Sequence, residues 1–462
     1  MPKKKTALTI EERLQQALVP AEEQPYEVPE NWVWVRLGSL AQDMADGPFG
    51  SNLKTEHYTN NKEVRIIQLS NIGENGWRED NKKYTTFEHA KVIARSKVEA
   101  GDIVIAKMMP AGRAIICPSY EQQYVLSSDA VKFVPNSLVD NNFCCKGINS
   151  YFFQTLVQEN TQGITRARTS IKKLKGYPFP LPPLSEQQRI VERIEELFAK
   201  LDEAKERLQE VADSFAVRKA AILHKAFTGE LTKQWRRENG VSDESWEEKK
   251  LEEVCSKITD GTHNSPTNSL SGEYMYVTAK NIKDTGIDLS NITYVTKEVH
   301  KEIYSRCDVI YGDVLYIKDG ATAGIATINT LEEEFSMLSS VALIRTDLKL
   351  AKNEFVKDYL NYRKKEILKN ISGSAITRLT LSKIKDILVP LPSLPEQHEI
   401  VRLIDDLLAR ERAAQQAAEQ ALASIDLMKK SILARAFRGE LGTNKASEAS
   451  ALELLRQVLA EN

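Results

Sequence analysis

The sequence predicts an α/β (α+β) protein in which two globular domains are separated by two long antiparallel coiled-coil helices. Three observations predict this class. The 462 residues are too many for one hydrophobic core. The chain repeats itself with a period of 210 residues, so that Leu181 recurs as Leu391. Each repeat also joins mixed strand and helix patterns to a long heptad pattern. The order is therefore globular, helical, globular, helical, with a pseudo-two-fold internal repeat.

The repeat divides the chain into six segments, which also define where we expect its domains to begin and end. These segments are an N-terminal helical segment at 1–30, a first globular domain (domain 1) at 31–180, a first long-helix region at 181–236, a second globular domain (domain 2) at 246–390, a second long-helix region at 391–445 and a tail helix at 446–462.

The two ends of the chain both carry short helical patterns. A Thr9-x-x-Glu12 capping box opens a helix at the N-terminus. Leucines at helical spacing mark an amphipathic piece from Ala451 to Ala460. These patterns predict a short helix near each end of the chain.

The globular domains are predicted from short apolar runs bounded by turn residues, with one late helix in each. These runs have strand-like composition and recur in both copies. The predicted strands are 64–69, 101–106 and 131–134 in domain 1 and 275–279, 314–317 and 341–345 in domain 2, and the helices are 149–158 and 353–369.

The helical regions are the best-matched parts of the repeat, because 20 of 51 aligned positions are identical between 181–231 and 391–441. The first copy has apolar residues spaced alternately by four and three from Ile190 to Phe215, which is a coiled-coil seam. A Ser185-x-x-Gln188 capping box is expected to start this helix, and Gly229 to stop it. The second seam is interrupted by Glu411. A narrow apolar stripe does not hold so long a helix alone, so the two copies should pack together.

Composition places the chain among soluble globular proteins. Its 63 Lys and Arg against 65 Asp and Glu give a net charge of −2, so the whole-chain charge does not indicate nucleic-acid binding. The five cysteines lack zinc spacing, and neither a signal peptide nor a membrane span is recognisable. These features favour a cytoplasmic protein. The six histidines show no ligand spacing, so we expect no metal site.

Local charge is more informative than the total. Domain 1 has 19 basic and 14 acidic residues, whereas domain 2 has 20 and 21. A basic stretch near the end of domain 1 recurs in domain 2, and such cations position a protein on phosphates without reading sequence. The candidates for phosphate contact are Arg166, Arg168, Lys172 and Lys173 in domain 1, and Arg378 and Lys383 in domain 2.

Reading bases requires side chains with paired donors and acceptors, as in Arg, Lys, Asn and Gln. Candidates lie in the loops and strand ends of both globular domains. They are Asn52, Lys54, Gln68, Asn71, Lys107 and Arg113 in domain 1, and His263, Lys280, Asn281 and Lys318 in domain 2. The pairs Asp46-Gly47 and Asp260-Gly261 are typical of turns that could present such residues.

The sequence contains none of three common signatures of catalysis. There is no phosphate-binding GxxxxGK[ST] loop, no GxGxxG fingerprint and no HExxH helix. We therefore expect no catalytic residues and no cofactor bound by this chain.

The order and duplication of several motifs resemble the DNA-specificity subunit (S subunit) of type I restriction-modification systems. Each helical copy begins with Leu-Pro-x-Leu-x-Glu-Gln, at 181–187 and 391–397, and ends with Ala-Phe-x-Gly-Glu-Leu. The stretches 25–32 and 46–52 are also similar to that family. The resemblance covers nearly the whole chain.

The resemblance implies a function for each segment. The globular units would be target-recognition domains that each read one half of a split, asymmetric target in double-stranded DNA, and the paired helices would separate them. The implied partners are two methyltransferase subunits and two ATP-dependent restriction subunits. S-adenosylmethionine, ATP and Mg would then belong to those partners, and this chain would be the non-catalytic subunit.

Two alternatives remain at this point. The chain could be a coiled-coil interaction scaffold whose globular domains bind proteins or small ligands. Binding to phosphates should weaken steeply with salt, whereas an apolar scaffold contact should hardly change. The chain could also be a restriction enzyme fused to its own reader, although no residues remain for a catalytic domain.

Overall fold

The computed structural model describes residues 8–461 except 75, 109, 162–167 and 370–377. Its residues group into two compact units whose boundaries cut through the long helices. Unit 1 consists of Met1–Leu208 together with Ala421–Asn462, and unit 2 is the continuous segment Gln209–Gln420. Domain 1 thus lies in unit 1, and domain 2 lies in unit 2.

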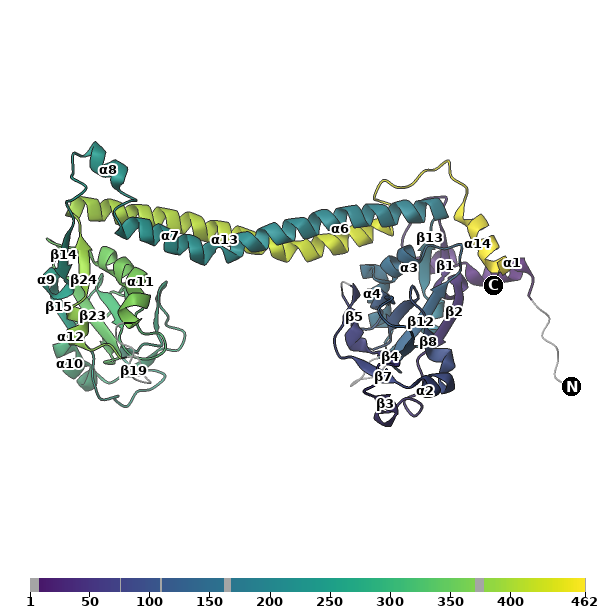
Figure 1. The fold of residues 1–462 in the computed structure, drawn as a ribbon, viewed down its shortest axis with the longest axis horizontal. Coiled ribbons are helices and arrows are strands. Elements are labelled where there is room, and N and C mark those ends of the chain that lie inside the picture. Colours follow the sequence, from purple (N-terminus) through teal and green to yellow (C-terminus); the bar gives the residue numbers. More distant parts are fainter. Residues whose placement is uncertain (1–7, 75, 109, 162–167, 370–377, 462) are drawn as a thin grey trace. The chain divides into compact units, whose positions relative to one another are not determined.

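Domain 1 and the N-terminal segment contain short strands, short helices and 3-10 turns (Figure 1). The strands are β1 (Val33–Arg36), β2 (Ala41–Asp46), β3 (Tyr58–Thr59), β4 (Val64–Ile67), β5 (Ile72–Gly73), β6 (Gly76–Trp77), β7 (Lys83–Thr85), β8 (Lys97–Val98), β9 (Ile103–Ala106), β10 (Ala114–Ile116), β11 (Tyr124–Leu126), β12 (Ala130–Pro135) and β13 (Pro178–Leu181). The helices are α1 (Ile10–Ala17), α2 (Phe87–Val92), α3 (Asn141–Ile148), α4 (Tyr151–Glu159) and α5 (Ile171–Gly176), and the 3-10 turns are Ala21–Glu23, Leu37–Leu40, Thr55–His57, Leu69–Asn71 and Ala94–Ser96.

Domain 2 repeats most of these elements. Its strands are β14 (Glu247–Lys250), β15 (Cys255–Asp260), β16 (Tyr274–Val277), β17 (Ile282–Lys283), β18 (Gly286–Ile287), β19 (Thr293–Val295), β20 (Val314–Ile317), β21 (Ala326–Ile328), β22 (Phe335–Met337), β23 (Val341–Thr346) and β24 (Leu388–Leu391). Its helices are α9 (Leu251–Val254), α10 (Lys297–Arg306), α11 (Asn353–Lys369) and α12 (Leu381–Lys385). The remaining helices are α6 (Leu184–Asp213), α7 (Phe215–Phe227), α8 (Lys233–Glu238), α13 (Leu394–Ala436) and α14 (Ala451–Glu461).

The four-stranded sheets of the two domains have the same strand order, which confirms the predicted internal repeat. The strand order β10-β9-β12-β2 of domain 1 matches β21-β20-β23-β15 of domain 2. A second sheet pairs β4 with β11 in parallel and β7 with β4 in antiparallel orientation, and β16, β22 and β19 repeat both pairings. One domain therefore occurs twice in this chain.

The central strand of the first sheet is buried on both faces. In β9, Ile103 and Ile105 belong to the core shared with the helices, whereas Val104 and Ala106 face the core between the two sheets. Strand β20 alternates between two cores in the same way. This explains why both strands are continuous apolar runs in the sequence.

The long helices pack antiparallel within each unit, as predicted. In unit 1, Asp202 of α6 pairs with Lys429 of α13 at 2.5 Å, and Lys205 lies 3.9 Å from Asp426. In unit 2, Arg218 of α7 pairs with Glu411 of α13 at 2.5 Å. The polar residue that interrupts the second seam therefore has a cationic partner on the facing helix.

Three details of the predicted helices are wrong. The first long helix is divided at Ser214 into α6 and α7. Helix α6 begins at Leu184, so Ser185 lies within its first turn and is not an N-cap. Val211, which falls on the predicted seam between Ile190 and Phe215, is exposed. Gly229 does follow the end of α7, with a φ of +78°.

The start of each long helix is joined to its globular domain by a buried Glu-Gln pair. Gln187 accepts a hydrogen bond from the Asp140 backbone at 2.8 Å and donates one to the Pro182 carbonyl at 2.9 Å. Gln397 makes the equivalent bonds with the Lys352 backbone and the Pro392 carbonyl, both at 2.9 Å. The recurring Glu-Gln motif therefore fixes each helix to the domain that precedes it.

The neighbouring glutamates are also fully buried, and each is held by the segment that ends the opposite helix. Glu396 pairs with Arg236 at 2.6 Å and accepts a hydrogen bond from Thr232 at 2.7 Å. Glu186 accepts hydrogen bonds from the Trp32 indole at 2.8 Å and the Asn444 amide at 2.9 Å. Each unit thus has a buried carboxylate (the Glu186 or Glu396 anchor) where both long helices meet the globular domain.

The far ends of the helices complete the cores of the globular domains. Phe437, just after α13, packs against Phe143 and Phe179 of domain 1. Phe227 at the end of α7 packs against Phe355 and Tyr359 of domain 2. Each globular core therefore contains the C-terminal end of the long-helix region that follows the other globular domain in the sequence.

Both chain ends lie together in unit 1. Helix α1 has the expected capping box, with Thr9 bonded to the Glu12 backbone. Helix α14 lies beside α1 (Figure 1), where Leu455 joins Leu14 in the core of domain 1. Helices α1 and α14 are therefore part of one hydrophobic core.

The Asp-Gly pairs are not turns, contrary to the sequence interpretation. Asp46 is the last residue of β2 and pairs with Val131, and Gly47 continues this pairing by donating to the Ala130 carbonyl at 3.0 Å. A Cβ atom at Gly47 would lie 1.8 Å from the Ser127 carbonyl oxygen. A Cβ at Gly261 would lie 1.9 Å from the Met337 carbonyl oxygen. Both glycines are required because two backbone segments approach closely there.

We expect Gly47→Ala to destabilise domain 1 by about 1–3 kcal/mol, since the new methyl group must displace backbone. Gly50→Ala is the matched control, because a Cβ there has nothing within 4 Å. Urea denaturation of both variants measures the difference. Equal midpoints for the two variants would show that the backbone contact is not required.

No helix in the described residues is long and apolar enough to cross a membrane. All five cysteines are free thiols. Burial raises the pKa of Cys117, Cys145, Cys255 and Cys307 to about 12, so these thiols stay protonated at neutral pH.

Candidate nucleic-acid interface

The basic segment near the end of each domain is attached to the turn that follows the central strand. In domain 1, Lys107 donates its backbone N–H to the Asp129 carbonyl at 2.8 Å, and its own carbonyl accepts from Thr169 at 2.9 Å. In domain 2, the Lys318 carbonyl accepts from Leu379 at 2.8 Å. In each domain, the turn that contains this lysine, the end of strand β2 or β15 and the basic segment therefore form one edge. We call this edge the basic edge.

The basic edge of domain 1 has two partly exposed ion pairs. Lys107 Nζ lies 2.7 Å from Asp46 Oδ1, and Arg168 Nη2 lies 2.8 Å from Asp129 Oδ1. Such surface pairs are weak, so a phosphate can compete for either cation. Arg166 lies outside the described residues.

The basic edge of domain 2 is organised around one buried carboxylate. Asp260 is 1% exposed and lies 3.0 Å from Lys318, 2.5 Å from Arg306 and 3.4 Å from His263. Lys318 is only 3% exposed. The ammonium group of Lys318, a candidate for base contact, is therefore buried against Asp260. His263 stays exposed, but it faces Arg306 at 3.2 Å.

Asn71 and Asn281, two other candidates for base contact, have their side-chain amides bonded to the backbone of their own turns. The fully buried amide of Asn71 accepts a hydrogen bond from the Gln68 backbone at 2.9 Å and donates to the Asp80 carbonyl at 2.6 Å. The Asn281 amide makes equivalent bonds with the Thr278 backbone and the Asp288 carbonyl. Their recurrence in both copies reflects a shared turn after β4 and β16.

The other predicted residues differ in how far they are available to a ligand. Asn52, Lys54, Lys172, Lys280, Arg378 and Lys383 are exposed, although Lys54 lies 3.7 Å from Glu56 and Arg378 lies 3.4 Å from Asp319. Three more are half-buried: Gln68, Arg113, which lies 3.8 Å from Glu74, and Lys173, which donates to the Asn160 carbonyl at 2.6 Å.

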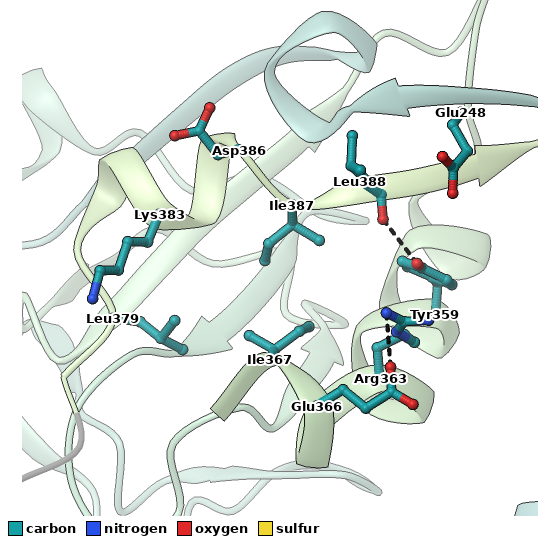
Figure 2. Close-up of a pocket in the computed structure, with 10 residues that line it drawn as sticks. All are labelled: Glu248, Tyr359, Arg363, Glu366, Ile367, Leu379, Lys383, Asp386, Ile387 and Leu388. Atoms are coloured by element: carbon teal, nitrogen blue, oxygen red, sulfur yellow. Dashed lines mark hydrogen bonds and ion pairs between the residues drawn. The ribbon is translucent and has the colours of Figure 1, made fainter. Parts of the chain in front are cut away.

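Lys383 also lines a cavity of about 400 Å³ in unit 2. Figure 2 shows Lys383 on the side of this cavity opposite the Arg363–Glu366 ion pair, whose length is 2.7 Å. The Tyr359 hydroxyl in the same cavity donates to the Leu388 carbonyl at 2.8 Å. Tyr359, Arg363 and Glu366 therefore have partners in the cavity wall, and Lys383 is the basic residue that faces the cavity from α12.

The sequence patterns did not single out Arg306, although a usable signal was present. Arg306 lies six residues before Gly312, and Arg95 lies six residues before the equivalent Gly101.

The described residues contain no group of three or more His, Cys, Asp or Glu side chains that could hold a metal ion.

Two copies of one α+β domain, each with a basic edge and each completed by the ends of long paired helices, define a class of duplicated DNA-specificity proteins. The model of the type I restriction modification DNA specificity domain matches residues 29–213 and 243–421. The chain belongs to this family.

Individual relatives agree with the family match. The chain is 24% identical over 466 residues to the type I restriction enzyme EcoKI specificity subunit of Escherichia coli K12, covering 94% of this chain and 96% of that one. It is 28% identical over 331 residues to the EcoBI specificity subunit of Escherichia coli, covering 67% and 69% of the two chains. The crystal structure of the HsdS subunit from Thermoanaerobacter tengcongensis has the same fold, with a TM-score of 0.63, 21% identity and coverage of 91% and 100%. The chain is thus a type I specificity subunit, and the scaffold alternative is not favoured.

Proposed function

We propose that this chain reads a bipartite, asymmetric target in double-stranded DNA, with one half-site for each globular domain. The observation that carries the proposal is the pair of basic edges, which occupy the same topological position but differ in chemistry. Lys107 pairs with Asp46 at a partly exposed site, whereas Lys318 is buried against Asp260. Domain 1 also has a net charge of +5 and domain 2 of −1. Unlike edges on one shared fold are suited to unlike half-sites.

The same proposal assigns catalysis to partner subunits. Two methyltransferase subunits and two ATP-dependent restriction subunits would assemble with this chain in the cytoplasm. They would bind S-adenosylmethionine, ATP and Mg. This assignment is supported by the lack of catalytic motifs in the sequence.

Exchange of one globular domain tests the division of labour between the two domains. Residues 31–180 are replaced by the corresponding domain of another family member, and the methylated sequence is determined in cells that carry the complete system. We expect one half of a split motif to change and the other half to stay the same. Exchange of residues 246–390 is the matched control and should change only the other half. A change in both halves after a single exchange would contradict the proposal.

A further inference from the structure

A groove in unit 1 lies beside the basic edge of domain 1. It is formed by the loop after β2, by the segment from Val92 to Ser96, and by Ile171 at the start of α5, and its volume is about 270 Å³. Asp46, the partner of Lys107, also lines it. The groove therefore adjoins the cations proposed to hold phosphates.

Two large apolar side chains of this groove are unusually exposed. Phe49 is 82% exposed and Val92 is 77% exposed. Together they give the groove an apolar surface that water solvates poorly, as expected of a surface that is covered when a ligand binds. The polar side chains of Asn52 and Arg95 line the same groove.

Arg95 differs from its counterpart in domain 2. Arg306, at the same distance before the Gly-Asp pair, is bound to Asp260 at 2.5 Å and lies 3.2 Å from His263. Arg95 is exposed and makes no hydrogen bond or ion pair with the residues that the structure describes. Its five N–H donors are therefore available to a ligand.

The loop that carries Phe49 and Asn52 is held in place by two stacked histidines. The rings of His57 and His89 lie 3.9 Å apart with an interplanar angle of 19°. His89 Nε2 lies 2.8 Å from the Asn52 carbonyl oxygen, and the Lys54 backbone donates to His57 Nδ1 at 3.0 Å. A loop ordered before binding loses less conformational entropy when it binds.

We propose that this groove contacts base edges in the half-site bound by domain 1, and that Arg95 is its specificity-determining residue. The proposal rests on the proposed function. Arg95 has the planar fork that pairs with O6 and N7 of a guanine, and Asn52 can pair with an adenine. Phe49 and Val92 provide apolar contact for a thymine methyl group or a base face. The loop histidines act as positioning residues.

The test uses the specificity subunit assembled with its methyltransferase, and DNA duplexes in which each position of the target is varied in turn. We expect Arg95→Ala to reduce discrimination roughly 5- to 100-fold at one base pair of the domain 1 half-site. Discrimination in the other half-site should be unchanged. Phe49→Ala should also change base preference or affinity only through the domain 1 half-site. Arg78→Ala is the matched control, because Arg78 is an exposed arginine of the same domain that pairs with Asp80.

Two results would overturn the proposal. Arg95→Ala could weaken binding equally for all sequences and lower the salt dependence by about one counterion, which would make Arg95 a phosphate contact. Arg95→Ala and Phe49→Ala could also both behave like the control. Thermal unfolding of each variant shows that the domain is intact. The proposed function fails separately if the wild-type complex does not read a split motif or if the domain exchange leaves the motif unchanged.

Discussion

Removal of residues 451–462 is expected to destabilise domain 1 by on the order of 5 kcal/mol, a large part of the stability of an ordinary domain. Helix α14 contributes Leu455, Val458 and Leu459 to the core that also contains the residues of β1 and α3. Burying each such side chain stabilises the fold by about 1.5–3 kcal/mol. The deletion should therefore abolish amide-exchange protection in domain 1 while domain 2 remains protected.

Point variants distinguish the effect of burying side chains of α14 from the effect of the presence of this helix. Leu455→Ala should cost about 2–5 kcal/mol, because it leaves a cavity in a fully buried site. Gln457→Ala, on the exposed face of the same helix, should change stability by less than about 0.5 kcal/mol. Unchanged protection of domain 1 after the deletion would mean that the tail is dispensable for its fold.

Glu396→Ala is expected to destabilise unit 2 by about 3–5 kcal/mol. Glu396 is fully buried, and its carboxylate is the main partner of Arg236, which is itself almost completely buried. Without Glu396, the guanidinium retains Asp243 at 3.0 Å, and this second carboxylate is largely exposed. A buried cation that has lost its principal counter-charge is strongly unfavourable. Chemical denaturation of the variant measures the effect.

A nearby ion pair on the same helix is the control for the Glu396 anchor. Glu399 pairs with the exposed Arg402 at 2.7 Å, so Glu399→Ala should cost about 1 kcal/mol or less. The double variant Arg236→Leu/Glu396→Leu should recover most of the stability, because no unpaired charge remains. Equal effects of Glu396→Ala and Glu399→Ala would show that burial of the anchor is energetically unimportant.

The architecture could be predicted because it follows from patterns that repeat. Helix α11 spans Asn353–Lys369, which are the residues expected from the sequence. The strands β9 and β20 follow equally directly from apolar runs, since a central strand buried on both faces leaves a continuous apolar signature. The capping box of α1 involves only side chains and backbone within four consecutive residues, so it too can be predicted from the sequence.

The residues of the candidate interface were harder to predict, because a residue that recurs at equivalent positions of both copies can be structural as readily as functional. Asn71 and Asn281 recur, but both amides bond to the backbone of their own turns. Lys107 and Lys318 occupy the same topological position, yet only Lys107 keeps access to solvent. Burial of a polar group depends on neighbours that are distant in the sequence, and a pattern of residue types does not contain that information.

The close agreement of the helical copies has an explanation within the fold. The matching positions concentrate at the two ends of the helices, where Glu186 and Ile194 of α6 and Ala226 and Phe227 of α7 are buried. The middle of the helices agrees little between the copies. Packing against two similar domains therefore accounts for the similarity of the helical copies.

Unit 1 is formed by two segments that are far apart in the sequence, and this determines the order in which a nascent chain can fold. Its core needs Phe437 and Leu455, which leave the ribosome about 250 residues after the last strand of domain 1. At translation rates of about 5–20 residues per second, this delay is roughly 10–50 s. Unit 2 is contiguous and finishes its own core meanwhile. The domain that is translated first is completed last, and until then it presents an unfilled apolar surface on which chaperones can act.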